Sequence, residues 1–317
     1  MRRIIGIGET VLDLVFRNDR PVAAVPGGST FNAMVSLGRT VPKRFPDIEI
    51  LMFTEVGDDH VGDLITSFMK ENHVGTEAVI RPKGSQSTLS LAFLDDRNDA
   101  AYEFYRSPAG KPEAAGELQF CSGDVVLFGS FFAIDPKLRS FTLPLLKAAR
   151  KAGATVYYDV NFRKNHLADL PEVLAGIEEN CRLSDFVRGS AEDFGYVYGT
   201  QDPLEIYRHV SPFCSNFICT CGAGPVHVFT EDSHMTFEVP QVETVSTIGA
   251  GDNFNAGFIY GLLCEKPGCA NAGKEGRTST FSAGQWQRLV AYATGFSSEA
   301  CRSLDNYVGP DFCADIE

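Results

Sequence analysis

Small residues and a carboxylate lie together at the start of an apolar stretch in VSTIGAGDNFNAGFIYGLL, residues 245–263, where we expect a helix to begin near Asn253. We expect the small residues Gly249, Ala250 and Gly251 to leave their backbone amides uncovered. A helix start presents unpaired N–H groups and the positive end of the helix dipole, which suits an anion such as a phosphoryl group. Asp252 follows directly, so we expect it to accept a proton from an attacking hydroxyl. The alternative is that Asp252 only caps the helix.

A second glycine-led segment is PGGSTFNAMVSLGRT, residues 26–40. Gly27 and Gly28 precede a helix and would let a polyhydroxylated ligand touch the backbone. The amide of Asn32, in the first turns of that helix, can both donate to and accept from vicinal hydroxyls. The alternative is an ordinary strand-to-helix turn.

These two segments, with VGDD at residues 56–59 between them, resemble the two signature segments of the PfkB/ribokinase family of carbohydrate kinases. Their order and separation match over nearly the whole chain. The resemblance implies ATP-dependent transfer of the γ-phosphoryl group to a sugar hydroxyl, with Asp252 as the catalytic base and residues 249–252 as the anion hole. It also implies that the sugar hydroxyls are bound by Asp13, Gly28 and Asn32.

The segment YDVNFR, residues 158–163, resembles the DxNxR segment of the fructokinase and ketodeoxygluconate kinase branch. The resemblance implies that Asn161 lies at the sugar and that Arg163 reaches toward sugar or phosphate, where a planar guanidinium suits phosphoryl oxygens. A further FYR segment resembles the one that places an aromatic ring, Phe104, and a cation, Arg106, over the sugar. The alternatives are a surface ion pair for Arg163 and a half-exposed hairpin face for FYR.

The segment TCGAG, residues 220–224, follows a buried strand and resembles the TxGxxG turn that holds nucleotide, one residue short in its spacing. The resemblance implies nucleotide contacts from Thr220, Gly222 and Gly224, and from the anion-hole residues Gly249 and Gly251. A helix over Gln285–Ala300 would supply the other wall of the adenine site.

Two positions depart from the family pattern. Ser246 stands where the family usually has an Asp linked to activation by monovalent cations, so potassium dependence stays open. The NxxE motif associated with magnesium and phosphates reads SAED, residues 190–193. We predict that Ser190 contacts the nucleotide and that Glu192 or Asp193 acts on Mg²⁺ through water.

For the acceptor we favour fructose or a related ketose, because the FYR and DxNxR patterns bring two arginines to the sugar. The closest rival is 2-keto-3-deoxygluconate, whose carboxylate would want the same arginines, although Phe104 stands where that branch tends to have a tyrosine. A nucleoside acceptor is a weaker rival. A non-catalytic sugar and nucleotide binder that keeps the fold is motivated by Ser246 and Ser190, yet the base and the anion-hole glycines that such proteins more often lose are present.

The elements that must position these residues alternate short apolar runs with amphipathic stretches, which predicts a parallel sheet covered by helices. We expect strands at residues 4–7, 50–53, 125–128, 155–158, 186–187 and 217–220. A helix should open at Asp135-Pro136 and end before Gly153, because Asp is a good cap and Pro suits the first helical position. Together with the resemblance, this predicts a single α/β domain over residues 1–317, a ribokinase-like three-layer α/β/α fold with a mostly parallel central sheet.

Residues 11–26 and 88–106 alternate more like antiparallel strands, and the second segment is expected to form a hairpin that turns at Asp95–Asp99. Paired with each other, the two segments would form a small sheet outside the main layer. The resemblance identifies this sheet as the family's β lid, formed by about residues 11–26 and 84–110, which commonly makes a dimer contact. We therefore expect a homodimer through the lid and lid closure that excludes water.

The composition disfavours several other classes of protein. The net charge of -13 and the pI of about 5.0 argue against nucleic-acid or anionic-membrane partners, because phosphate groups attract basic surfaces. No apolar stretch is long enough to span a bilayer. Nine scattered cysteines, an odd number, predict reduced thiols in a cytoplasmic protein. GCANAGK at residues 268–274 spells most of a P-loop, but Glu275 stands where Ser or Thr must hold magnesium, so we discount it.

Overall fold

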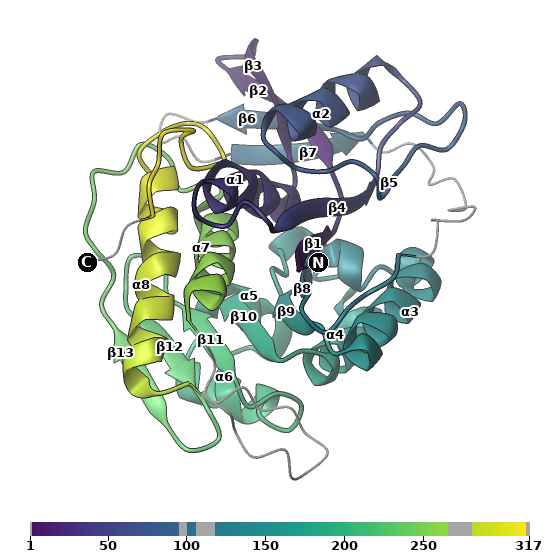
Figure 1. The fold of residues 1–317 in the computed structure, drawn as a ribbon. Helices are drawn as coiled ribbons and strands as arrows, with labels where there is room; N and C mark the ends of the chain where they lie inside the picture. Colours follow the sequence, from purple (N-terminus) through teal and green to yellow (C-terminus); the bar gives the residue numbers. More distant parts are fainter. Residues whose placement is uncertain (1, 95–99, 106–117, 266–280, 315–317) are drawn as a thin grey trace.

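The computed structural model describes residues 2–94, 100–105, 118–265 and 281–314, which form a nine-stranded sheet between two layers of helices and a separate four-stranded sheet (Figure 1). From edge to edge, the large sheet contains β13 (His234–Phe237), β12 (Val226–Phe229), β11 (Phe217–Thr220), β10 (Phe186–Ser190), β9 (Thr155–Asp159), β8 (Val125–Gly129), β1 (Arg3–Ile7), β4 (Glu49–Glu55) and β5 (Val79–Ile80). Neighbouring strands from β11 to β5 are parallel, whereas β12 and β13 join antiparallel. Central strands such as VVLFG are buried throughout, because helices cover both faces.

Each face of the large sheet has its own helical layer and its own apolar core. One layer contains α1 (Ser29–Arg44), α2 (His60–Glu71), α7 (Ala250–Cys264) and α8 (Ala283–Ala300). The other contains α3 (Pro136–Ala152), α4 (Leu170–Leu183), α5 (Ala191–Tyr198) and α6 (Pro203–Val210), with the 3₁₀ turns η1 (Phe131–Ala133) and η2 (Lys164–His166). Helix α7 is apolar on nearly all sides because it packs between the sheet, α1 and α8. This central position fixes the start of α7 against the sheet.

The four-stranded sheet, which we call the lid sheet, has the order β3 (Arg20–Gly27), β2 (Val11–Arg17), β6 (Leu89–Leu94) and β7 (Ala100–Tyr105). The β2/β6 pair is parallel and the other two pairs are antiparallel. Two segments far apart in the sequence therefore meet in one sheet outside the main layer, as predicted. The lid sheet lies above the main sheet in the view of Figure 1.

Most of the expected elements are confirmed, including the six strands and the helix over 136–152, which Asp135 caps and which ends at a left-handed Gly153. The start of α7 was placed wrongly, because this helix begins at Ala250 and not near Asn253. The expected turn at 95–99, the lid residues 106–110 and the segment 268–274 lie outside the described residues. Within the part of the chain that the structure describes, no helix is long and apolar enough to cross a membrane.

Candidate active site

The candidate site lies at the carboxyl ends of β9, β10 and β11, where α7 begins. These strands end at Asp159, Ser190 and Thr220. In open α/β sheets, ligands bind outside the carboxyl ends of the strands, where loops and helix starts offer backbone groups. Just after β9, the buried Asn161 has a φ of 37°, a backbone conformation that asparagine tolerates better than most residues. The DxNxR segment therefore turns sharply as it leaves the sheet.

Asp252 lies in the first turn of α7 and does not occupy the cap position. The cap is Gly249, whose φ of 76° suits glycine, and no side chain caps this helix start. The alternative reading of Asp252 as a helix cap is therefore wrong. The Asp252 carboxylate is buried instead, and its Oδ2 accepts a hydrogen bond of 2.8 Å from Asn32 Nδ2 at the start of α1.

The surroundings of Asp252 make its carboxylate more basic than usual. Burial raises the pKa of Asp252 to about 6, the hydrogen bond from Asn32 lowers this pKa, and the charge of Asp159 raises it. A carboxylate with this pKa is mostly ionised at pH 7 and is still basic enough to accept a proton from a reacting hydroxyl. Asp252 is thus suited to general base catalysis.

The backbone amides at the start of α7 are only partly as expected. The Ala250 amide donates to the Thr247 carbonyl over 3.2 Å, so the prediction that this amide is uncovered was wrong. Among the described residues, the amides of Gly251 and Asp252 have no carbonyl partner. The Gly249 amide likewise has no partner within that part of the chain, so Ala250 alone departs from the prediction and Asp252 is added to it. Unpaired N–H groups at the positive end of a buried helix are suited to bind an anion.

A second carboxylate, Asp13 on β2, comes to the same region from the lid sheet. Burial raises the pKa of Asp13 to about 6, and the charge of Asp252 raises it as well. A side chain at Gly27 would overlap the Asp13 carboxylate. At Gly28, which has a φ of 124°, a side chain would overlap the Glu9 carbonyl. Gly27 therefore allows the backbone to pass close to the Asp13 carboxylate, and Gly28 allows it to pass close to the Glu9 carbonyl.

Asn32 binds Asp252 with its side-chain nitrogen, and among the described residues its side-chain oxygen is unpaired. Its side chain is buried and donates to Asp252, while its Oδ1 has no hydrogen-bond partner within the described part of the chain. A buried amide oxygen without a partner is costly, so this atom is suited to accept a hydrogen bond from a ligand hydroxyl. Asn32 therefore offers a polar acceptor beside Asp252.

The strand register of the lid sheet places Phe104 on the same face as Asp13. Asp13 lies opposite Ser90, and Ser90 lies opposite Phe104 on β7. Directly paired residues of neighbouring strands point to the same face of a sheet. The Phe104 side chain is 42% exposed, so this face carries an exposed aromatic ring two strands away from the carboxylate. Arg106, predicted beside it, lies outside the described residues.

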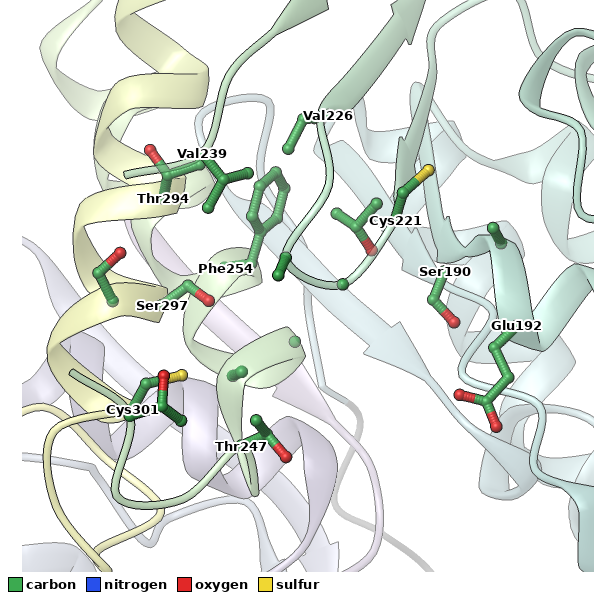
Figure 2. Close-up of a pocket in the computed structure, with 18 of the residues that line it drawn as sticks. Ser190, Glu192, Cys221, Val226, Val239, Thr247, Phe254, Thr294, Ser297 and Cys301 are labelled. Carbon is green, nitrogen blue, oxygen red and sulfur yellow. The ribbon is translucent and has the colours of Figure 1, made fainter. Parts of the chain in front are cut away.

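A cavity of about 670 Å³ extends from the start of α7 between α8 and the strand ends (Figure 2). Thr294 and Ser297 of α8 line one side, and Val226 and Cys221 line the opposite side. Thr220 and Gly222 also line the cavity, and the turn that holds them closes with a 2.9 Å bond from the Gly224 amide to the Cys221 carbonyl. The volume and the mixed apolar and polar lining suit a nucleotide-sized ligand.

The SAED segment has a structural role as well as a place in the cavity lining. Ser190 caps α5 by accepting from the Asp193 amide, and Asp193 Oδ2 accepts from the Ser190 amide over 2.9 Å. Asp193 Oδ1 is buried and has no hydrogen-bond partner among the described residues. Glu192 lies exposed at the cavity and accepts from the Tyr196 hydroxyl. No group of three or more candidate metal ligands occurs within the described residues.

Two arginines line the cavity, and sequence reasoning found only one of them. The predicted Arg163 has a 63% exposed side chain and reaches Asp193 at 3.9 Å. Arg188 on β10 is buried, and it contacts Asp159 at 3.1 Å and the Thr220 hydroxyl at 2.7 Å. The strand sequence FVRGS could have identified Arg188. Side chains alternate along a strand, so Arg188 lies on the same face as Phe186, toward α7.

Together, this fold and site define an enzyme that transfers a phosphoryl group to a hydroxyl of a small molecule. The model of the pfkB family of carbohydrate kinases matches residues 1–279, so the chain belongs to this family and is a carbohydrate kinase.

Individual relatives agree with the family. A fructokinase of Rhizobium leguminosarum bv. trifolii is 28% identical to the chain over 271 residues, which cover 82% of the chain and 79% of that protein. The structure of a Vibrio cholerae O395 fructokinase with fructose, ADP and calcium ion matches with a TM-score of 0.79 and 21% identity, covering 96% of this chain and 94% of that one.

The structure of an aminoimidazole riboside kinase from Salmonella enterica, complexed with aminoimidazole riboside and an ATP analog, matches with a TM-score of 0.76 and 20% identity, covering 98% and 97%. At these identities the solved structures establish the fold alone. They confirm the expected ribokinase-like architecture, with its mostly parallel sheet and its small separate sheet.

Proposed function

We propose that the chain transfers the γ-phosphoryl group of ATP to a hydroxyl of fructose or a related ketose. The observation that carries the proposal is the position of Asp252, a buried carboxylate in the helix turn whose unpaired amides adjoin a nucleotide-sized cavity. A base at this place can deprotonate an alcohol that attacks a phosphoryl group held by the amides. The fructokinases among the relatives support the choice of sugar.

In this mechanism the sugar lies between α1, the lid sheet and the start of α7. Asp13 and Asn32 Oδ1 accept hydrogen bonds from sugar hydroxyls, the backbone at Gly27 and Gly28 approaches the ring, and Phe104 covers an apolar face of it. The bond from Asn32 to Oδ2 fixes the Asp252 carboxylate, and Asp252 takes the proton as the hydroxyl attacks in line. Asn161 and, beyond the described residues, Arg106 are assigned to the same sugar.

The nucleotide occupies the cavity in this proposal. Its base lies toward α8, its ribose and phosphates pass the turn at Thr220, Gly222 and Gly224, and its terminal phosphate meets the amides of Gly251 and Asp252. Ser190 lines the same channel, and Arg163 offsets phosphate charge from the solvent side.

The acidic residues at the cavity fit a magnesium ion that is shared with the nucleotide. Asp193 Oδ1 is buried without a hydrogen-bond partner in the described region, and the Glu192 carboxylate lies beside it in the sequence at the cavity. Mg²⁺ is usually held by one or two carboxylates through water together with substrate phosphates, so a larger protein cluster is unnecessary. Bound there, the ion would neutralise charge on the phosphates.

A panel of acceptors tests the proposal. Purified protein with ATP and Mg²⁺ is incubated with ketoses, aldoses, sugar acids and nucleosides, and sugar-dependent formation of ADP is measured. We expect the largest kcat/KM with fructose or another ketose. A preference for 2-keto-3-deoxygluconate would overturn the choice of sugar, and binding of sugar and ATP without product from any acceptor would support a non-catalytic binder.

The lid sheet supports the proposal of a homodimer and of closure over the sugar. Its face opposite Asp13 is largely apolar apart from Glu103: Phe16 stacks on Phe93 with ring centroids 5.0 Å apart, and Tyr105 is 57% exposed. Contact with the lid of a second copy would cover this face. Sedimentation equilibrium should give twice the chain mass, and Phe16→Glu should shift it to the monomer; a monomeric wild type would contradict this proposal.

A further inference from the structure

Arg188 is a buried cation that the proposed roles above leave unused. Its side chain is 7% exposed, on the strand β10 that lies between β9 and β11 in the large sheet. Taking a guanidinium out of water is expensive unless it is paired. Arg188 lies directly opposite Asp159 in the β9/β10 register, and its Nη1 contacts Asp159 Oδ1 at 3.1 Å. The pair is thus built into the strand alignment.

The contacts around the pair hold the guanidinium in one orientation. The other oxygen of Asp159 accepts a 2.7 Å hydrogen bond from Asn255 of α7. Arg188 Nη2 donates to the Thr220 hydroxyl over 2.7 Å, and the guanidinium lies 5.6 Å from the ring centroid of Phe254. Contacts from β9, β11 and α7 therefore orient one planar group.

The guanidinium still has donor capacity, and it lies against the start of α7. Its Nε is buried and has no hydrogen-bond partner among the described residues. A Cβ built on Gly251 would lie 3.0 Å from Nη1 and 3.1 Å from Nη2, so the guanidinium packs directly against the residue that supplies an unpaired amide. Arg188 also lines the cavity. The fixed charge and the unpaired amides thus adjoin one another.

We propose that Arg188 is a catalytic residue whose guanidinium contacts the terminal phosphates of the bound nucleotide beneath the start of α7, with Asp159 and Asn255 as its positioning residues. This inference rests on the proposed function. A buried, oriented cation stabilises the charge that develops on the transferring group and on the leaving phosphate more strongly than an exposed one, because little water screens it. Arg163, which is largely exposed, is the weaker of the two charges.

Equilibrium binding separates a phosphate contact from a purely structural role. We would measure the affinity of wild type, Arg188→Met and Arg188→Lys for ATP and for adenosine by calorimetry. Adenosine fills the same cavity without phosphates. We expect Arg188→Met to lose about tenfold or more in ATP affinity, as the loss of one charge-assisted hydrogen bond implies, while its adenosine affinity stays near wild type. Equal losses for both ligands, or no loss, would overturn the inference.

Two further variants test the inference even if Arg188→Met fails to fold. Arg188→Met leaves Asp159 buried without its partner, so the double variant Arg188→Met/Asp159→Asn removes both charges together, and Arg188→Lys retains a cation without the planar fork. In each folded variant the ratio of ATP to adenosine affinity should fall. Arg182→Met on the surface of α4 is the matched control and should leave the ratio unchanged.

Binding also distinguishes failure of this inference from failure of the proposed function. If the wild-type protein binds no ATP, both the kinase proposal and this inference are contradicted. If the wild-type protein phosphorylates a sugar but the Arg188 variants keep the wild-type ratio of ATP to adenosine affinity, the kinase proposal stands. Only the role of Arg188 is then contradicted.

Discussion

Asn32 donates a 2.8 Å hydrogen bond to Asp252, and this contact joins the starts of two helices whose residues lie 220 positions apart in the sequence. The bond orients the carboxylate while the remaining oxygen of Asn32 has no partner within the described residues. One asparagine can therefore align the proposed base and bind the hydroxyl that the base deprotonates. The proposed mechanism depends on this junction of α1 and α7.

The pH dependence of turnover should report the pKa of Asp252. Because burial raises this pKa to about 6, the carboxylate becomes protonated, and inactive as a base, as the pH falls through that value. We expect kcat/KM for the sugar to be level above pH 7 and to decline about tenfold per pH unit well below pH 6. Asp13, whose pKa is also about 6, can steepen the decline. A profile that stays level down to pH 4.5 would contradict a raised pKa for the base.

Removal of the Asn32 amide should shift this profile. The hydrogen bond from Asn32 lowers the pKa of Asp252, so Asn32→Ala should raise the pKa and move the acid limb of kcat/KM to higher pH. The same change removes an acceptor for the sugar and should raise KM for the sugar more than KM for ATP. Thr200→Ala, on the surface between α5 and α6, is a control that should change neither quantity. An acid limb that moves to lower pH would contradict the assigned contact.

Asp252→Asn should stabilise the folded protein at high pH. The pKa of Asp252 is about 6 when folded and near its ordinary 3.8 when unfolded, so the ionised carboxylate costs folding free energy above pH 6. Asparagine removes this cost, and we expect the free energy of unfolding at pH 8 to rise by on the order of 3 kcal/mol. Near pH 4 the advantage should shrink, because the native carboxyl is then neutral. Denaturant titrations at the two pH values check this, and an equal effect at both would exclude desolvation as the cause.

Alanine at two adjacent glycines should have different effects. At Gly27 the new methyl group would displace the Asp13 carboxylate, so we expect a higher KM for the sugar with a modest loss of stability. At Gly28 it would meet the backbone carbonyl of Glu9 at a positive φ, and we expect destabilisation of about 1–3 kcal/mol. Gly295→Ala, in α8 with open space around it, is the control. Kinetics and thermal melts of the three variants provide the comparison.

The parts of this structure that sequence predicted are those in which local pattern and fold agree. The apolar runs at β1, β8, β9 and β11 and the capped, glycine-ended helix α3 could be predicted because their signals lie within a few residues. The hairpin of β12 and β13 was missed, although the polar turn between Phe229 and His234 was a usable signal.

The least predictable parts of the site depend on long-range pairing. The strand at β10 was expected to end at Val187, yet it continues through Arg188 to Ser190. Its burial is possible only because the register brings Asp159 opposite it, and single-sequence patterns do not encode register between distant strands. The free amide of Asp252 was likewise missed, since it depends on where α7 starts.

The most direct measurement is the rate of phosphoryl transfer by Asp252→Asn, with ATP and fructose saturating at pH 8 and the sugar phosphate identified by mass spectrometry. The account predicts a loss of kcat of about 10²- to 10⁴-fold, the usual contribution of a general base, with ATP affinity close to that of wild type. Turnover by Asp252→Asn near the wild-type rate would contradict the assignment of Asp252 as the base.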